Sequence, residues 1–127
     1  MSRILVVDNE LNLRLAYREV LNDGGYEVLE AESAKDTFDI LKCEPVDLVV
    51  LDIKLRSESG LDVLQRIANE FPHLPVILCS AYASFQTDYT SWLAESYIIK
   101  SSDLEELLNE VNRVLSKRGK IEAYSSK

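Results

Sequence analysis

Short runs of β-branched and leucine residues alternate along this chain with stretches in which apolar residues recur every three or four positions. The short runs predict strands, and the longer periodic stretches predict amphipathic helices. Strands are expected at residues 4–7, 27–31, 47–51, 75–79 and 96–99. Helices are expected at residues 13–21, 34–41, 61–71, 84–94 and 104–115, so that the two kinds of element alternate five times.

This alternation predicts a parallel sheet with helices on both faces, an α/β fold. Because crossovers between parallel strands are right-handed, we expect a doubly wound (βα)5, flavodoxin-like fold with strand order 2-1-3-4-5. Gly24-Gly25 is expected to close the first helix, Ser33 to cap the second, and Ser102 to Glu105 to form a capping box for the last. Residues 1–118 are expected to form one domain, and the polar residues 119–127 a frayed tail or the start of a linker.

The charge and composition of the chain exclude several classes of function. A net charge of −8 over 127 residues argues against direct nucleic-acid binding, which depends on Lys and Arg to neutralise phosphates. No apolar run could span a membrane, and the first residues lack the features of a signal peptide, so a cytoplasmic location is expected. In that compartment Cys43 and Cys79 are expected to be buried thiols rather than a disulfide.

Polar residues follow four of the predicted strands, and those four strands are neighbours in the order 2-1-3-4-5. Because sites in such sheets form beyond the carboxyl ends of the strands, these residues are expected around one crevice. They are Asp8, Asn9 and Glu10 after the first strand, Asp52 after the third, Ser80 after the fourth and Lys100 after the fifth.

These residue types suit phosphoryl chemistry. Mg²⁺ takes oxygen ligands, often one or two carboxylates with phosphate and water. An aspartate can attack phosphorus and form an aspartyl phosphate. Asp52 is the strongest candidate for that nucleophile, because a charge at the end of an apolar run needs a partner. Asp8 and Asn9 have the simpler alternative of capping the first helix, and Ser80 or Lys100, taken singly, that of a loop hydroxyl or a solvated charge.

The chain resembles response-regulator receiver domains over about residues 3–117. The resemblance is carried, in order and at matching spacing, by residues 4–10, 47–52, 60–64, 76–81 and 97–100. It implies a phosphorylation-dependent switch in a two-component system, whose phosphoryl donor is a histidine kinase or a phosphotransfer protein. It also implies a phosphoacceptor that catalyses only its own phosphoryl transfer and dephosphorylation, and so is not an enzyme acting on other molecules. The signal is expected to pass to an output partner, which the sequence does not identify.

The resemblance also implies a role for individual residues. Asp52 matches the phosphoacceptor. The Mg²⁺ site is implied at Asp8 and Asn9 with Asp52 and the backbone carbonyl of Lys54, and Glu10 is a further candidate donor.

Other positions match residues that bind or respond to the phosphoryl group. Lys54 and Tyr82 flank the implied attack path and are expected to set the lifetime of the phosphoryl group, which we expect to be long. The matching switch residues are the Ser80 hydroxyl, the small Ala81 that leaves the acceptor accessible, the aromatic Tyr97, and Lys100, which pairs with phosphoryl oxygens.

The sequence departs from the family pattern in four places. Asn9 stands where a second acid is usual, so a lower metal affinity is expected. Arg56 and Ser101 replace prolines, and without proline the peptide between Lys100 and Ser101 is expected to be trans. The stretch between Ser80 and Lys100 is about two residues short and lacks the usual glycine-rich turn. It contributes to the surface of the last two helices and last strand, which receivers use for partners or for a second copy of themselves.

Two alternatives remain beside the switch. Asn9 favours a degenerate receiver that acts as a phosphorylation-independent protein-binding module. A phosphatase with an aspartate nucleophile is the other, but such enzymes commonly carry an acid two residues after the nucleophile, where this chain has Lys54. An ammonium there cannot serve as that general acid without a large change in its pKa.

Overall fold

The structure, a computed structural model, describes residues 2–55, 58–81, 93–100 and 103–125, with residues 118–125 described by their backbone alone. The helix expected at residues 84–94 therefore falls almost entirely outside the described residues. The described elements are β1 (Arg3–Val7), α1 (Leu11–Asp23), β2 (Glu27–Ala31), α2 (Ala34–Cys43), β3 (Leu48–Asp52), α3 (Gly60–Glu70), β4 (Val76–Ser80), β5 (Ser96–Ile99) and α4 (Glu105–Ser125).

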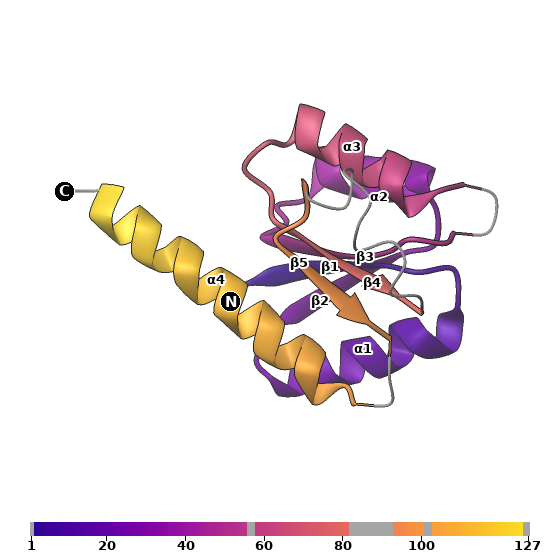
Figure 1. Cartoon of the computed structure of the whole chain (residues 1–127), viewed down its shortest axis with the longest axis horizontal. Coiled ribbons are helices and arrows are strands. Elements are labelled where there is room, and N and C mark those ends of the chain that lie inside the picture. The colour runs from indigo at the N-terminus through magenta and orange to yellow at the C-terminus, as the bar shows by residue number, and fades with distance from the viewer. Residues whose placement is uncertain (1, 56–57, 82–92, 101–102, 126–127) are drawn as a thin grey trace.

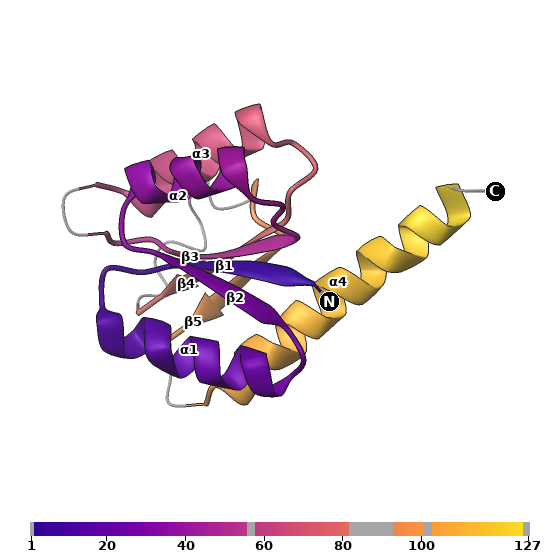
Figure 2. The same cartoon turned by 180° about the vertical axis from the view of Figure 1, so that it is seen from behind.

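The five strands form one parallel sheet in the order β2-β1-β3-β4-β5, which confirms the predicted topology. Helices α1 and α4 lie against one face of the sheet, and α2 and α3 lie against the other (Figure 1). The view from behind shows the same two layers (Figure 2). The sheet is therefore the middle layer of three, as expected for a doubly wound fold.

The central strands are apolar on both faces because each face has its own core. In β1, Leu5 and Val7 point into the core shared with α2 and α3, whereas Ile4 and Val6 point into the core shared with α1 and α4. All four side chains are almost completely buried. This two-sided burial explains why the strand is an unbroken apolar run rather than an alternating one.

The predicted signals at the ends of the early helices are present. Gly24 follows α1, and Gly25 has a φ of 96°, a left-handed conformation that favours glycine. The Ser33 hydroxyl accepts the backbone N–H of Asp36 at 3.2 Å and so caps α2.

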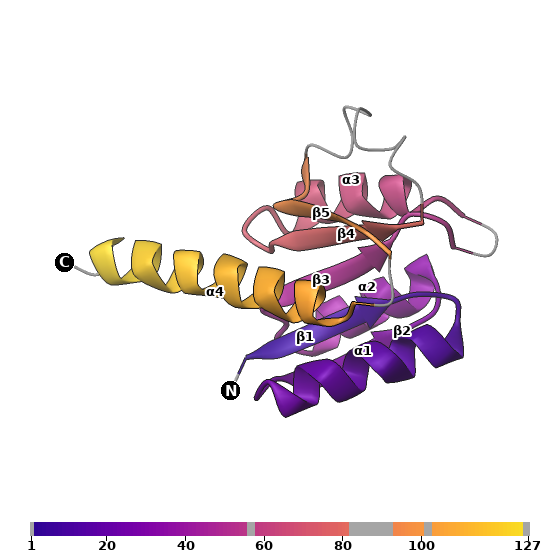
Figure 3. The ribbon, with the colours of Figure 1, turned by 60° about the horizontal axis from the view of Figure 1, so that its bottom comes forward.

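The capping box expected at the start of the last helix is only partly covered by the described residues. Ser102 lies outside the described residues, and the Asp103 carboxylate accepts the N–H of Glu105 at 3.0 Å. The helical backbone of α4 continues to Ser125, whereas a frayed tail was expected from Gly119. In Figure 3 this end of α4 extends beyond the edge of the sheet.

Two further observations concern the cysteines and the membrane. Cys79 in β4 is buried as expected, but the same expectation is wrong for Cys43, which is exposed at the end of α2. Both thiols are free. Among the helices in the described part of the chain, none combines the length and the apolar content that a bilayer crossing requires.

Candidate functional site

The carboxyl ends of β1, β3, β4 and β5 meet at one edge of the sheet, beside an open pocket of about 460 Å³. The topology alone brings these strand ends together, because parallel strands of one sheet all end at the same edge. The pocket is lined by Asn9, Glu10, Asp52, Lys54, Leu55, Ser80, Ala81 and Lys100.

The Lys100 ammonium lies between two buried carboxylates at the base of this pocket. Its Nζ is 3.0 Å from Asp8 Oδ2 and 3.1 Å from Asp52 Oδ2. Asp8 and Asp52 are only 1% and 6% exposed. One cation therefore faces two carboxylates in a site that water screens poorly, and this excess of negative charge favours the binding of a further cation.

The burial of these groups changes their pKa values. Burial raises the pKa of the Asp52 carboxyl, and the nearby Asp8 adds to the increase, so the pKa lies above its usual value although Lys100 opposes the change. Burial by itself would lower the pKa of Lys100, but the Asp52 and Asp8 carboxylates outweigh it and raise that pKa. Burial also raises the pKa of the Cys79 thiol, which is beside Asp52 in the sheet, to about 12, so this thiol stays protonated at neutral pH.

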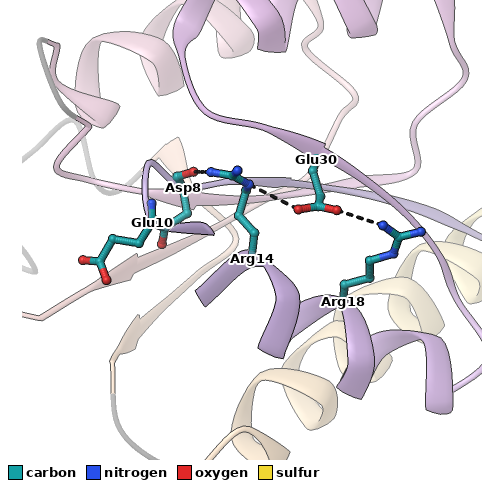
Figure 4. Close-up of polar contacts among 5 residues, drawn as sticks. All are labelled: Asp8, Glu10, Arg14, Arg18 and Glu30. Atoms are coloured by element: carbon teal, nitrogen blue, oxygen red, sulfur yellow. Dashed lines mark hydrogen bonds and ion pairs between the residues drawn. The ribbon is translucent and has the colours of Figure 1, made fainter. Parts of the chain in front are cut away.

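The three polar residues after β1 have different environments. The Asp8 Oδ1 atom accepts the backbone N–H of Glu10 at 2.9 Å. Glu10 itself is the N-cap residue of α1 and makes no side-chain cap bond, so Asp8 shapes the entry to the helix without capping it. Asn9 is half-buried and Glu10 is exposed, and both line the pocket. The Glu10 carboxylate points away from Arg14 and Glu30 (Figure 4). In the part of the chain described, no three acidic, histidine or cysteine side chains gather as metal ligands.

Sequence reasoning did not single out Arg14. Its guanidinium donates from Nη1 to the backbone carbonyl of Asp8 at 2.6 Å and from Nε to Glu30 Oε1 at 3.2 Å (Figure 4). Arg14 lies in the first turn of α1, and Glu30 lies on β2. The available signal was an arginine six residues after Asp8, but its partner on β2 becomes a neighbour only through the strand pairing.

The loop after Asp52 turns back closely on the end of β3. The Lys54 N–H donates to Asp52 Oδ1 at 3.2 Å, and the Gly60 N–H donates to the Ile53 carbonyl at 2.6 Å. A Cβ atom at Gly60 would lie 2.0 Å from the backbone oxygen of Asp52. Only glycine permits this approach, and the start of α3 thereby supports the backbone that carries Asp52.

Glu58, in the same loop, links the segment after Asp52 to a distant helix. Its Oε1 atom accepts the backbone N–H of Ala34, the first residue of α2, and its carbonyl accepts the N–H of Leu55. The carboxylate thus satisfies one of the unpaired donors at a helix N-terminus. Sequence reasoning missed this residue as well, because the contact joins a loop to the start of a helix 24 residues earlier in the chain.

Ser80 and Tyr97, which belong to neighbouring strands, lie close to each other. Ser80 is the last residue of β4 and is buried, and its carbonyl accepts the N–H of Lys100 at 2.6 Å. Burial raises the pKa of the half-buried Tyr97, and a hydrogen bond with the Ser80 side chain acts in the opposite direction. Ala81 is exposed at the rim of the pocket, so no side chain larger than a methyl group stands there.

Three further positions from the sequence analysis lie outside the described residues, in addition to Ser102. They are Arg56, Tyr82 and Ser101, so the peptide between Lys100 and Ser101 also lies outside them.

The fold and the acidic, lysine-containing pocket define a class of signalling protein. A sequence model described as the response regulator receiver domain matches residues 4–112, and the chain belongs to this family. It is a receiver domain of the kind found in two-component response regulators.

The curated relatives differ in length. Sporulation initiation phosphotransferase F of Bacillus subtilis is 30% identical over 116 residues, which cover 90% of this chain and 94% of that protein. Other relatives are longer, and the chain spans only 24% to 45% of their length.

Two solved structures place the fold within the same family. The response regulator TrrA of Thermotoga maritima in complex with Mg²⁺-BeF has a TM-score of 0.85 and 37% identity, covering 89% of this chain and 98% of that one. TrrA in complex with the histidine kinase ThkA has a TM-score of 0.84 and 37% identity, covering 91% of this chain and 99% of that one.

Proposed function

We propose that Asp52 accepts a phosphoryl group from a histidine kinase or a phosphotransfer protein, with Mg²⁺, and that the chain relays this state to a partner or an output domain. The observation that carries the proposal is the contact of one ammonium, Lys100, with both buried carboxylates at the base of an open pocket. Phosphoryl transfer depends mainly on such positioning and charge neutralisation. The kinase complex and the Mg²⁺-BeF complex of TrrA support the same reading.

The donor set fits Mg²⁺. Asp8 and Asp52 offer two carboxylates that contact the same ammonium, Asn9 lines the same pocket and has a neutral oxygen, and Lys54, whose carbonyl is a further candidate donor, also lines it. Magnesium sites often use one or two carboxylates with water and phosphate oxygens. When bound, the metal supplies charge neutralisation at the phosphoryl oxygens.

The residues of the chain have separate roles in the phosphoryl transfer. One Asp52 oxygen forms a bond to phosphorus while the bond from phosphorus to the donor breaks, and its electron pair leaves with the donor. Lys100 contacts Asp52 already and neutralises charge on the incoming oxygens, and Ser80 can donate its hydroxyl to one of them. The short Ala81 side chain leaves the approach to Asp52 open.

The switch is proposed at Ser80 and Tyr97. If the Ser80 hydroxyl turns toward a phosphoryl oxygen, its hydrogen bond with Tyr97 must break or rearrange. Tyr97 lies on β5, and its side chain packs on the face of the sheet that α2 and α3 cover. The change is proposed to pass along β5 to the surface for an output partner or a second copy of the chain. Lys54 and Tyr82 are proposed to set the phosphoryl lifetime.

The wider setting is also a proposal. We place the receiver domain at residues 1–118, with 119–127 as a polar C-terminal tail or the start of a linker, and the protein in the cytoplasm with its kinase. A net charge of −8 supports protein partners rather than direct nucleic-acid binding by this domain.

The proposal is tested by incubating the protein with Mg²⁺ and acetyl phosphate and measuring the intact mass. We expect the wild type to gain one phosphoryl group and Asp52→Asn to gain none. Asp62→Asn, which removes an exposed aspartate of α3, serves as the matched control and should gain the group. If the wild type gains nothing while a competent receiver does so in parallel, the alternative of a phosphorylation-independent binding module, which Asn9 favours, takes its place.

A further inference from the structure

We propose that Arg14 is a positioning residue for the Mg²⁺ and phosphoryl site, acting through the backbone of Asp8 rather than touching metal or phosphate. This inference rests on the proposed function. It assigns a role to the one arginine that contacts the carbonyl of a candidate metal ligand among the described residues.

Asp8 is held at each of its hydrogen-bonding groups. Its N–H donates to the Ala31 carbonyl at 3.1 Å, and its Oδ1 accepts the N–H of Glu10 at 2.9 Å. Its carbonyl accepts Nη1 of Arg14 at 2.6 Å, and its Oδ2 accepts Nζ of Lys100 at 3.0 Å. Three of these four contacts have no part in charge balance within the pocket, so their effect is to set where the carboxylate points.

Arg14 can perform this role because it is itself held in place. Its side chain is 12% exposed, and Glu30, which accepts its Nε, is 20% exposed. The other oxygen of Glu30 accepts Nη1 of Arg18 at 3.0 Å, one helical turn further along α1 (Figure 4). Glu30 lies opposite Val6 of β1 in the sheet, so the contact ties the guanidinium to the rigid sheet rather than to a loop.

The carbonyl that Arg14 holds is part of the peptide plane between Asp8 and Asn9. Fixing that plane therefore fixes the position of the Asn9 backbone nitrogen as well as that of the Asp8 carbonyl. Orientation matters more here than in a site with three carboxylates, because Asn9 contributes only a neutral oxygen. Groups that orient metal ligands typically change metal affinity by about 10- to 100-fold when they are removed.

Charge and positioning make opposite predictions for Arg14. Removing a cation near a metal site weakens electrostatic repulsion, so charge alone predicts tighter Mg²⁺ binding in Arg14→Met. Positioning predicts weaker binding. A loss of affinity in this variant therefore cannot come from the charge change.

The experiment compares Arg14→Met with Arg18→Met by calorimetric Mg²⁺ titration of the full chain. The control removes the same charge and loses the same Glu30 partner, but among the described residues Arg18 makes no hydrogen bond or ion pair with Asp8. We expect Arg14→Met to weaken Mg²⁺ binding about tenfold and Arg18→Met to leave it unchanged or slightly tighter. Unfolding midpoints without Mg²⁺ show whether both variants are folded.

A conservative variant keeps the test decisive if Arg14→Met does not fold. Arg14→Lys keeps the charge but not the fork that reaches Asp8 and Glu30 together, so weaker Mg²⁺ binding is expected there too. Unchanged affinity in the folded Arg14 variants, or an equal loss in Arg18→Met, overturns the inference. A wild type that binds no Mg²⁺ overturns the proposed function itself, and with it this inference, so the two failures are told apart by the wild-type titration.

Discussion

Lys100 Nζ lies 3.1 Å from Asp52 Oδ2, and the two side chains are 16% and 7% exposed. The same nitrogen also contacts Asp8. The pair is therefore not a simple salt bridge, because one ammonium balances two buried carboxylates. The remaining negative charge makes the site both a source of instability and a place for a divalent cation.

Removing the Lys100 ammonium should destabilise the folded protein. We expect Lys100→Met to lower the free energy of unfolding without Mg²⁺ by about 3 kcal/mol, because two buried carboxylates are left without their partner. Mg²⁺ should recover part of the loss by replacing the missing cation. Urea unfolding with and without Mg²⁺ measures both effects. Lys35→Met, which breaks an exposed pair with Asp39, is the control, and an equal loss there would contradict the prediction.

The raised pKa of Asp52 predicts a pH dependence of stability. The folded protein holds the Asp52 proton more tightly than the unfolded chain, whose aspartate has a pKa of about 3.9. Ionisation of Asp52 therefore destabilises the fold as the pH rises through the raised folded pKa. We expect Asp52→Asn to raise the unfolding temperature at pH 7, with a gain that shrinks toward pH 4. A gain in unfolding temperature that is constant over this range, or that grows at low pH, would contradict a pKa of Asp52 raised by burial.

Gly60 is expected to tolerate no side chain. A Cβ atom there would meet the Asp52 backbone oxygen at 2.0 Å, so Gly60→Ala should destabilise the protein by about 3 kcal/mol and lower phosphoryl uptake. Gly24→Ala is the matched comparison, because the close contact of its Cβ would be with the flexible end of Leu108, and the Leu21 backbone oxygen would lie 3.4 Å away, an ordinary contact distance. We expect that variant to change stability by less than about 1 kcal/mol. Thermal unfolding measures the loss of stability in each variant. Similar losses in the two variants would show that the contact with the Asp52 backbone is not the reason for glycine at position 60.

Restoring an acid at position 9 should have two effects of opposite sign. Asn9→Asp adds a carboxylate next to Asp8 and Asp52, so we expect lower stability in the presence of a chelator. The same charge should tighten Mg²⁺ binding roughly tenfold, or by about 1.4 kcal/mol. Calorimetric titration and unfolding with EDTA measure the two effects. Asn12→Asp makes the same charge change at an exposed position of α1 and should show neither effect.

Much of this architecture could be predicted because local sequence patterns, such as apolar periodicity and helix caps, agree with the observed fold. The strand order followed from the alternation of elements, and Ser33 capped α2 as its position before an apolar stretch indicated. Boundaries were less accurate: β3 runs from Leu48 to Asp52, one residue later than expected, because pairing with β4 extends to Asp52. The exposure of Cys43 was missed, since a lone thiol at a helix end carries no local signal of burial.

The sequence by itself determined which chemistry reaches the carboxyl edge of the sheet, because the topology of alternating strands and helices brings four strand ends together whatever their side chains do. Only the tertiary structure decided how those side chains share contacts. Lys100 faces both Asp8 and Asp52, Glu30 anchors the Arg14 guanidinium that donates to the Asp8 carbonyl, and Glu58 accepts the first N–H of α2. Each of these arrangements depends on residues distant in sequence. Such contacts follow from side-chain direction and strand register, which no local spacing encodes.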